Sequence, residues 1–140
     1  MTIKIICFEG NDGTGKSSII RELNKKSKYK YICIDRFLGS SFCYNRNKEI
    51  DILRTDSELA DTTFTEFYLI YLYCSDKDIL IKRLKVKNDS DKIKLIERDK
   101  KRYEEYLEKT YFKTLELDTA KNSIEENVDE IIKFVEAEDE

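Results

Sequence analysis

A glycine-rich segment between a strand pattern and a helix pattern constrains this chain most. Residues Gly10 to Ser17 read GNDGTGKS and fit the phosphate-binding pattern G-x-x-x-x-G-K-[ST]. The glycines of that pattern let backbone N–H groups turn inward around an anion. The apolar, β-branched run from Ile3 to Phe8 predicts a buried strand before it, and a helical pattern from about Lys16 to Lys26 follows. Three of the chain's four glycines lie in this loop, although an ordinary strand–helix turn is the alternative interpretation.

Apolar runs and helical patterns alternate along the rest of the chain. We expect further strands at 31–34, 67–74 and 112–117, and helices from about 76, over about 90–109 and from 123. The spacing of Ser75 and Asp78, and that of Ser123 and Glu126, predicts capping boxes. Residues 41–65 are predicted to be helix and loop. The predicted fold is a P-loop NTPase three-layer α/β/α sandwich with a mostly parallel sheet of about four strands, in one domain spanning 1–140.

Composition excludes several chemistries. The 140 residues include no histidine, which excludes a Ser-His-Asp triad, a Cys-His pair and His-ligated zinc. No run of 18 apolar residues exists, so we expect no transmembrane helix and no membrane partner. The four cysteines stand singly and are interpreted as reduced thiols of a cytoplasmic protein, with two disulfides in a secreted domain as the alternative. The net charge of −3 gives no general signal for nucleic acid.

Two strong motifs resemble those of thymidylate kinases. The sequence FEGNDGTGKSS at 8–18 resembles their FEG-x-DG-x-GKST loop, and Asp35-Arg36-Phe37 resembles their DR-[YFHW] motif. Segments 72–84, 97–107 and 117–128 resemble later elements of that family more weakly. The chain departs from the family because the R-E-P-G-G segment that contacts the acceptor is missing, between about Lys26 and Lys30. Polynucleotide 5′-kinases place an essential aspartate at a similarly short distance after the loop.

The candidate site residues follow from phosphoryl transfer, which needs charge neutralisation and positioning. Lys16 reaches the β/γ phosphates in such loops, and the Ser17 hydroxyl binds Mg²⁺. Asp35 would accept the proton of an acceptor hydroxyl or orient a Mg²⁺-bound water, and Arg36 would hold an acceptor phosphate; a surface ion pair is the alternative for both. The predicted catalytic residues are Lys16, Asp35 and Arg36, and the predicted metal ligands are Ser17 and Asp35. The predicted nucleotide-binding residues are Gly10, Asn11, Asp12, Gly13, Thr14, Gly15, Lys16, Ser17, Ser18 and Arg83.

Three further groups have two interpretations each. The resemblance implies that Asp12 points toward the acceptor nucleoside, whereas a turn-stabilising role is the alternative. Cations around residues 88–91 predict a lid at about 85–95, with the resemblance placing Arg83 near the adenine or phosphates; solvated side chains are the alternative. These cations are Arg83, Lys85, Lys87, Lys92 and Lys94. The aromatic residues Phe37, Phe42 and Tyr44 either stack on an acceptor base or belong to the core.

The expected function is ATP- and Mg²⁺-dependent transfer of the γ-phosphoryl group to a (deoxy)nucleoside monophosphate by a thymidylate kinase-like enzyme. A 5′-hydroxyl polynucleotide or deoxynucleoside kinase is one alternative, and a non-catalytic nucleotide-binding protein is another. The expected partners are ATP and a small nucleotide acceptor, with a nucleic-acid 5′ end as the alternative acceptor. A homodimer is left open.

Overall fold

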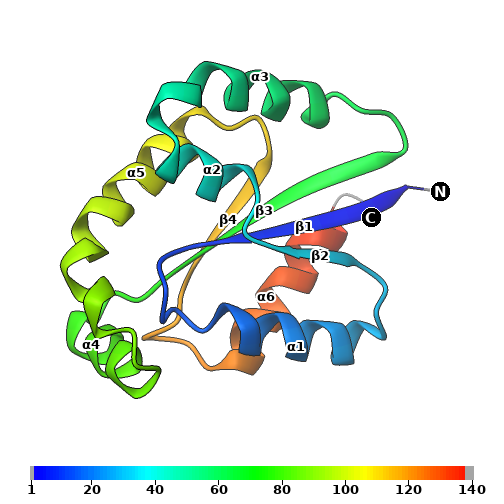
Figure 1. Cartoon of the computed structure of the whole chain (residues 1–140). Helices are drawn as coiled ribbons and strands as arrows, with labels where there is room; N and C mark the ends of the chain where they lie inside the picture. Colours follow the sequence, from blue (N-terminus) through cyan, green and yellow to red (C-terminus); the bar gives the residue numbers. More distant parts are fainter. Residues whose placement is uncertain (1, 138–140) are drawn as a thin grey trace.

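A four-stranded parallel sheet forms the centre of the molecule (Figure 1). The computed structural model describes residues 2–137, and the sheet within them has the order β2-β1-β3-β4. Its strands are β1 (Ile3–Glu9), β2 (Ile32–Asp35), β3 (Thr65–Tyr73) and β4 (Lys113–Asp118). The register places Ile6 of β1 between Cys33 of β2 and Tyr68 of β3. The two strands with the most continuous apolar runs therefore lie at the centre, as strands covered on both faces require.

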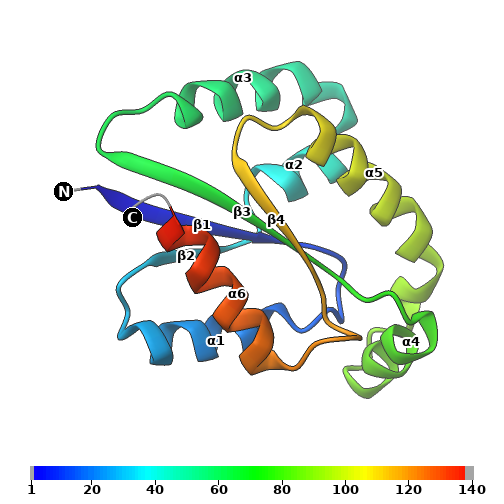
Figure 2. The ribbon, with the colours of Figure 1, turned by 180° about the vertical axis from the view of Figure 1, so that it is seen from behind.

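Helices cover both faces of the sheet. Figures 1 and 2 show α1 and α6 on one face and α2, α3 and α5 on the other, while α4 lies toward the end where β3 finishes. The helices are α1 (Lys16–Ser27), α2 (Leu38–Tyr44), α3 (Glu49–Ala60), α4 (Lys77–Val86), α5 (Ile96–Lys109) and α6 (Ile124–Glu136), with short 3₁₀ helices η1 (Arg46–Lys48) and η2 (Ser90–Leu95). The predicted three-layer α/β/α sandwich with four parallel strands is confirmed.

Alternate residues of β1 build the two halves of the core. Ile6 and Phe8 are fully buried beneath α1 and α6, whereas Cys7 packs against Phe42 and Tyr106 on the opposite face. The predicted edge position of β4 is also confirmed, since it pairs only with β3 among the described strands. This packing fixes the position of the loop that follows β1, because neither face of the strand can shift without opening a cavity.

Two local predictions are wrong. The helix expected over about 90–109 is divided into η2 and α5. The chain enters this region through Asn88, whose φ is 60°. The tighter 3₁₀ turns of η2 let Ile93 and Ile96 both pack on α4. The predicted Ser75–Asp78 capping box does not form, because Asp76 caps α4 and accepts bonds from the N–H groups two and three residues later at 3.0 and 3.2 Å. The Ser123–Glu126 capping box of α6 is confirmed.

The carboxyl ends of all four parallel strands lie along one edge of the sheet. The chain leaves β1 toward β2 through α1, and returns from β2 to β3 on the other side of β1 through α2 and α3. In open α/β sheets such a reversal of direction leaves a crevice at the strand ends, where ligands bind. The loop after β1 and the end of β2 both lie there. No helix within residues 2–137 has the length and apolar character needed to cross a membrane.

Candidate nucleotide-binding site

The loop between β1 and α1 adopts a backbone that its glycines alone permit. Gly10 has a φ of 146°, and a Cβ atom added there would lie 2.2 Å from the carbonyl oxygen of Leu72 on β3. Gly13 has a φ of 83°, and its Cβ would come within 3.0 Å of the Leu80 side chain. The loop is thus pressed against β3 and α4, with its backbone directed around the amino end of α1. This is the arrangement in which loop N–H groups and a helix N-terminus bind phosphate.

Lys16 folds back over this loop. Its side chain is buried, and Nζ donates hydrogen bonds to the carbonyl oxygens of Gly10 at 3.2 Å and Asn11 at 3.4 Å. Burial and the nearby charge of Arg36 lower the pKa of the Lys16 ammonium to about 8. A phosphate oxygen placed in the loop would give this ammonium a charged partner in place of two carbonyl dipoles. Lys16 therefore lies over the loop, and its contact with phosphate stays a prediction.

Asp35 and Arg36 end β2 beside the same loop. The charge of the exposed Asp35 carboxylate acts on Lys16 and opposes the lowering of its pKa. Arg36 has a left-handed backbone with a φ of 68°, and its N–H donates to the carbonyl oxygen of Phe8 at 2.9 Å. Such a conformation is unfavourable for arginine and persists where surrounding contacts enforce it, often at functional sites. It turns the guanidinium toward the loop after β1.

Asp12 pairs with cations from two separate parts of the chain. Its carboxylate forms an ion pair with Arg36 through one oxygen and with Lys92 of η2 through the other, at 3.0 Å from Lys92 Nζ. Partial burial raises the pKa of Asp12, but the hydrogen bond from Lys92 and the charge of Arg36 hold it below its usual value. The Asn11 side-chain amide also donates to the carbonyl oxygen of Ile96, at 3.0 Å. Part of the predicted lid segment therefore lies directly against the loop.

Arg83 lies on the opposite side of the loop from Arg36. Its guanidinium donates to the carbonyl oxygen of Gly13 at 3.3 Å, and to the hydroxyl and carbonyl oxygens of Thr119 at 3.0 and 3.3 Å. These contacts join α4, the loop after β1 and the loop after β4 around a cavity of about 250 Å³. Lys87 and Asn127 also line it, and the buried Oδ1 of Asn127 has no hydrogen-bond partner.

The aromatic residues after Arg36 separate into core and surface. Phe42 is fully buried against Tyr106, and Phe37 packs at the margin of the same cluster. Tyr44 is 46% exposed and lines a second cavity, of about 350 Å³, with Asp12, Arg36 and Lys92. Of the three aromatic residues proposed to stack on an acceptor base, Tyr44 is thus the one that faces the crevice.

Glu9 is a buried site residue that the sequence argument did not single out. Its carboxylate accepts hydrogen bonds from the N–H of Phe37 at 2.9 Å, the N–H of Ser40 at 3.2 Å and the Ser40 hydroxyl at 2.7 Å. A Cβ added at Gly39 would approach the same carboxylate to 2.7 Å. Burial raises the pKa of Glu9 in spite of these bonds. Glu9 fixes the start of α2 and hence the position of Arg36. The available signal in the sequence was a carboxylate directly after the apolar run of residues 5–8.

Ser17 and Asp35 suit the ion expected beside such a loop. Both side chains are exposed at the crevice, and both present oxygen, the donor that Mg²⁺ prefers. Within residues 2–137 there is no cluster of three or more Cys, Asp or Glu side chains that could hold a metal alone. A site with few protein ligands is typical of Mg²⁺, which keeps several waters and binds substrate phosphates. The role of Ser17 and Asp35 as Mg²⁺ ligands stays a prediction.

A solved structure gives the comparison with known proteins. The chain is similar to YorR of Bacillus subtilis, whose crystal structure contains phosphorylated GDP. The two are 26% identical, the TM-score is 0.76, and the match covers 96% of each chain. No protein-family model and no curated protein sequence matches this chain. The likeness supports the α/β fold over 96% of the chain, while thymidylate kinase specificity stays a prediction.

Proposed function

We propose that this protein is a nucleotide kinase that transfers the γ-phosphoryl group of ATP, with Mg²⁺, to a nucleoside monophosphate. The observation that carries the proposal is the convergence of Lys16, Arg36 and Lys92 on one phosphate-binding loop, with Asp12 as their common neighbour. Three cations around an anion-binding backbone match a reaction whose transition state spreads negative charge over phosphoryl oxygens. The fold that the chain shares with YorR is consistent with this chemistry.

The donor nucleotide would lie across the loop with its base near Arg83. The cavity beside Arg83 lies next to Gly13 and the amino end of α1, so a triphosphate in the loop and a base in this cavity are contiguous. Asn127 Oδ1 in the cavity wall lacks a hydrogen-bond partner and would accept a bond from a base amino group. Lys87 lines the same cavity and would meet the sugar or phosphate side of the donor.

The acceptor would lie on the Arg36 side. A phosphate there would draw Arg36 and Lys92 away from Asp12, because a doubly charged phosphate is a stronger partner for each cation than a shared carboxylate. Asp12 would then be free to accept a hydrogen bond from the acceptor. This cation pair favours a phosphate-bearing acceptor over the bare 5′-hydroxyl of the alternative function.

Residues of the chain would act mainly by positioning. Lys16 would move from the loop carbonyl oxygens to the β/γ phosphates, and Arg36 would hold the attacking phosphate in line with the γ-phosphorus. Ser17 and Asp35 would hold Mg²⁺, which when bound neutralises charge on the β/γ phosphate oxygens. Asp35 would also accept the acceptor proton if the acceptor were a hydroxyl. None of these roles needs histidine.

The test is a panel of acceptors with γ-labelled ATP and Mg²⁺, separated by thin-layer chromatography. Guanine nucleotides are tested first, because the YorR structure contains phosphorylated GDP. The other (deoxy)nucleoside monophosphates, nucleosides and 5′-hydroxyl oligonucleotides complete the panel. Label on a nucleoside diphosphate is the expected result. Label only on nucleosides or oligonucleotide ends would contradict the proposal and support the 5′-hydroxyl kinase. ATP binding without phosphoryl transfer would indicate a non-catalytic protein.

A further inference from the structure

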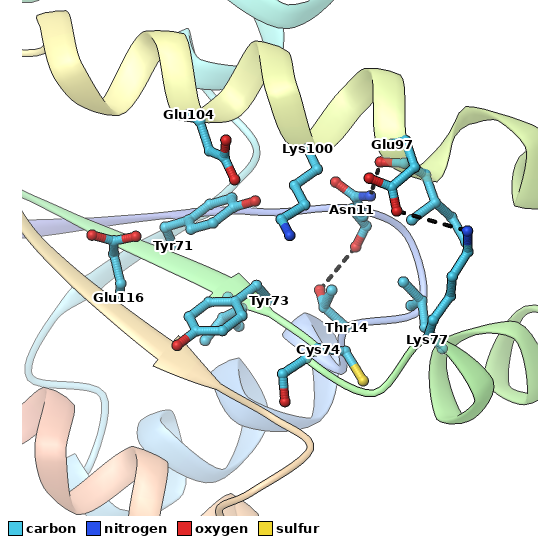
Figure 3. Close-up of a pocket in the computed structure, with 14 residues that line it drawn as sticks. Asn11, Thr14, Tyr71, Tyr73, Cys74, Lys77, Glu97, Lys100, Glu104 and Glu116 are labelled. Carbon is cyan, nitrogen blue, oxygen red and sulfur yellow. Dashed lines mark hydrogen bonds and ion pairs between the residues drawn. The ribbon is translucent and has the colours of Figure 1, made fainter.

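A third cavity, separate from the donor and acceptor sides, opens between α5 and the carboxyl ends of β3 and β4 (Figure 3). Its volume is about 360 Å³, within the range of small-molecule sites. Tyr71 and Tyr73 form one wall with their rings nearly parallel, at a centroid distance of 6.1 Å and an interplanar angle of 20°. Leu72, Leu80 and Ile96 contribute apolar surface. Two of its lining residues, Asn11 and Thr14, belong to the loop after β1, and its other lining residues have no role in the proposed phosphoryl transfer.

Asn11 supplies an unused hydrogen-bond acceptor in the wall of the cavity. The residue is 8% exposed, and its Nδ2 is already bonded to the carbonyl oxygen of Ile96. The other amide atom, Oδ1, is buried without a partner. Figure 3 shows the Asn11 side chain beside Lys100, on the side of the loop that faces the cavity. A buried acceptor left unpaired is costly, and a donor group of a bound ligand or an ordered water would satisfy it.

The charges around the opening disfavour an anionic ligand. Glu97, Glu104 and Glu116 line the cavity together with Lys77 and Lys100. Lys77 pairs with Glu97 at 3.7 Å, which leaves two carboxylates facing a single lysine. Figure 3 shows Glu104 and Glu116 on either side of Tyr71. The cavity therefore offers stacking surface and hydrogen-bond acceptors, and a phosphate group would meet net negative charge.

From these features we propose that the cavity binds an uncharged, amino-bearing heteroaromatic ring of nucleobase size. The ring stacks on Tyr73, and its amino group donates to Asn11 Oδ1 or to a neighbouring carboxylate. Base–aromatic stacking tolerates many ring types, so the acceptor atoms provide the selection for an amino group. Because Asn11 belongs to the loop after β1, such a ligand contacts that loop through the Asn11 side chain. The inference does not rest on the proposed kinase activity.

The probe is 2-aminopurine, whose fluorescence is quenched when it stacks on an aromatic ring. The chain contains no tryptophan, so little protein signal overlaps with that of the probe. We expect saturable quenching that persists in excess Mg-ATP. In Tyr73→Leu, the affinity for the probe should fall by at least about fivefold, which is the smallest effect expected from the loss of one stacking contact. Tyr111→Leu is the matched control, because Tyr111 is 67% exposed and lies outside the cavity. Absence of saturation, displacement by Mg-ATP, or equal binding by Tyr73→Leu would overturn the proposal.

A second measurement needs no variant. Cys74 lines the cavity and is half-buried, whereas Cys33 is half-buried on β2 outside it. Bound 2-aminopurine should slow alkylation of Cys74 by iodoacetamide, followed by mass spectrometry, and leave Cys33 unchanged. Adenine should displace the probe several-fold better than purine, which lacks the amino group. An unprotected Cys74 at saturation would refute the location, and equal displacement by purine would refute the proposed recognition of the amino group.

Discussion

Lys16→Met should make the ligand-free protein more stable while removing its proposed phosphate contact. The reason is the environment of the Lys16 ammonium, which is buried in the loop and has its pKa lowered to about 8 from its usual 10.5. A folded-state pKa below the unfolded value means that folding disfavours the charged form. The penalty is complete below about pH 8 and is relieved as the pH rises toward the unfolded value. Methionine has a similar length and carries no charge.

The size of the effect follows from the same numbers. The lowering of the pKa corresponds to a penalty of about 3 kcal/mol at neutral pH. Replacement also removes the bonds from Nζ to the carbonyl oxygens of Gly10 and Asn11, a loss of about 1–2 kcal/mol. We therefore expect Lys16→Met to raise the free energy of unfolding by about 1–2 kcal/mol near neutral pH. The melting temperature should rise by about 3–8 °C.

Urea unfolding of the wild type and the variant at two pH values is the assay. The advantage of the variant should shrink by about 2 kcal/mol between about pH 7 and about pH 9.5, because the wild type regains stability in this window. Taking the difference between the two proteins cancels the titration of tyrosines and other groups that they share. A variant less stable than the wild type at neutral pH, or an advantage that does not change with pH, would refute the reasoning.

Three further predictions concern the loop and its supports. Asp12→Asn removes both ion pairs of Asp12 and should increase amide hydrogen exchange in η2 (Ser90–Leu95) severalfold relative to the wild type, whereas unchanged exchange would mean that these pairs do not hold the segment. Gly10→Ala should lower the free energy of unfolding by about 3 kcal/mol or more, because the added Cβ meets a backbone oxygen. Gly15→Ala should lower it by only about 1–2 kcal/mol through backbone strain, because nothing lies within 4 Å of its Cβ. Equal losses of stability in chemical unfolding would contradict this prediction. Asp56→Ala should lower stability by about 3–5 kcal/mol, since Asp56 is fully buried and accepts bonds from two side-chain hydroxyls and one backbone N–H; a loss below about 1 kcal/mol would show that water replaces them.

The sheet could be predicted because its signals are local. Apolar runs such as that from Ile3 to Phe8 mark strands covered on both faces, and the alternation in Lys113–Asp118 marks an edge. The glycine pattern predicted the loop because a side chain at Gly10 would collide with β3. The division of the expected 90–109 helix was not predictable, since the residues that pack Ile93 and Ile96 belong to α4, and the periodicity of one segment does not reveal its contacts with another.

The sequence predicted where several candidate residues lie in the fold, but not how their side chains pair. The sequence predicted Lys16, Asp35 and Arg36 at one edge of the sheet, because parallel strands end together. It could not predict that Arg36 turns to Asp12 through a left-handed backbone, or that Lys92 reaches the same carboxylate. The role of Glu9 was missed for the same reason, since its three hydrogen-bond donors belong to residues about 30 positions later in the chain. Pairings of this kind depend on tertiary packing.

The measurement that tests the central claim most directly is transfer of the labelled γ-phosphoryl group from ATP to a nucleoside monophosphate by the wild type and by folded Lys16→Met. The proposed mechanism predicts a labelled nucleoside diphosphate with the wild type, and a rate at least about 100-fold lower with the variant, which loses a charge aimed at the transferred group. Circular dichroism and urea unfolding confirm that the variant is folded. Undiminished turnover by the folded variant, or no labelled diphosphate from any monophosphate with the wild type, would contradict the claim.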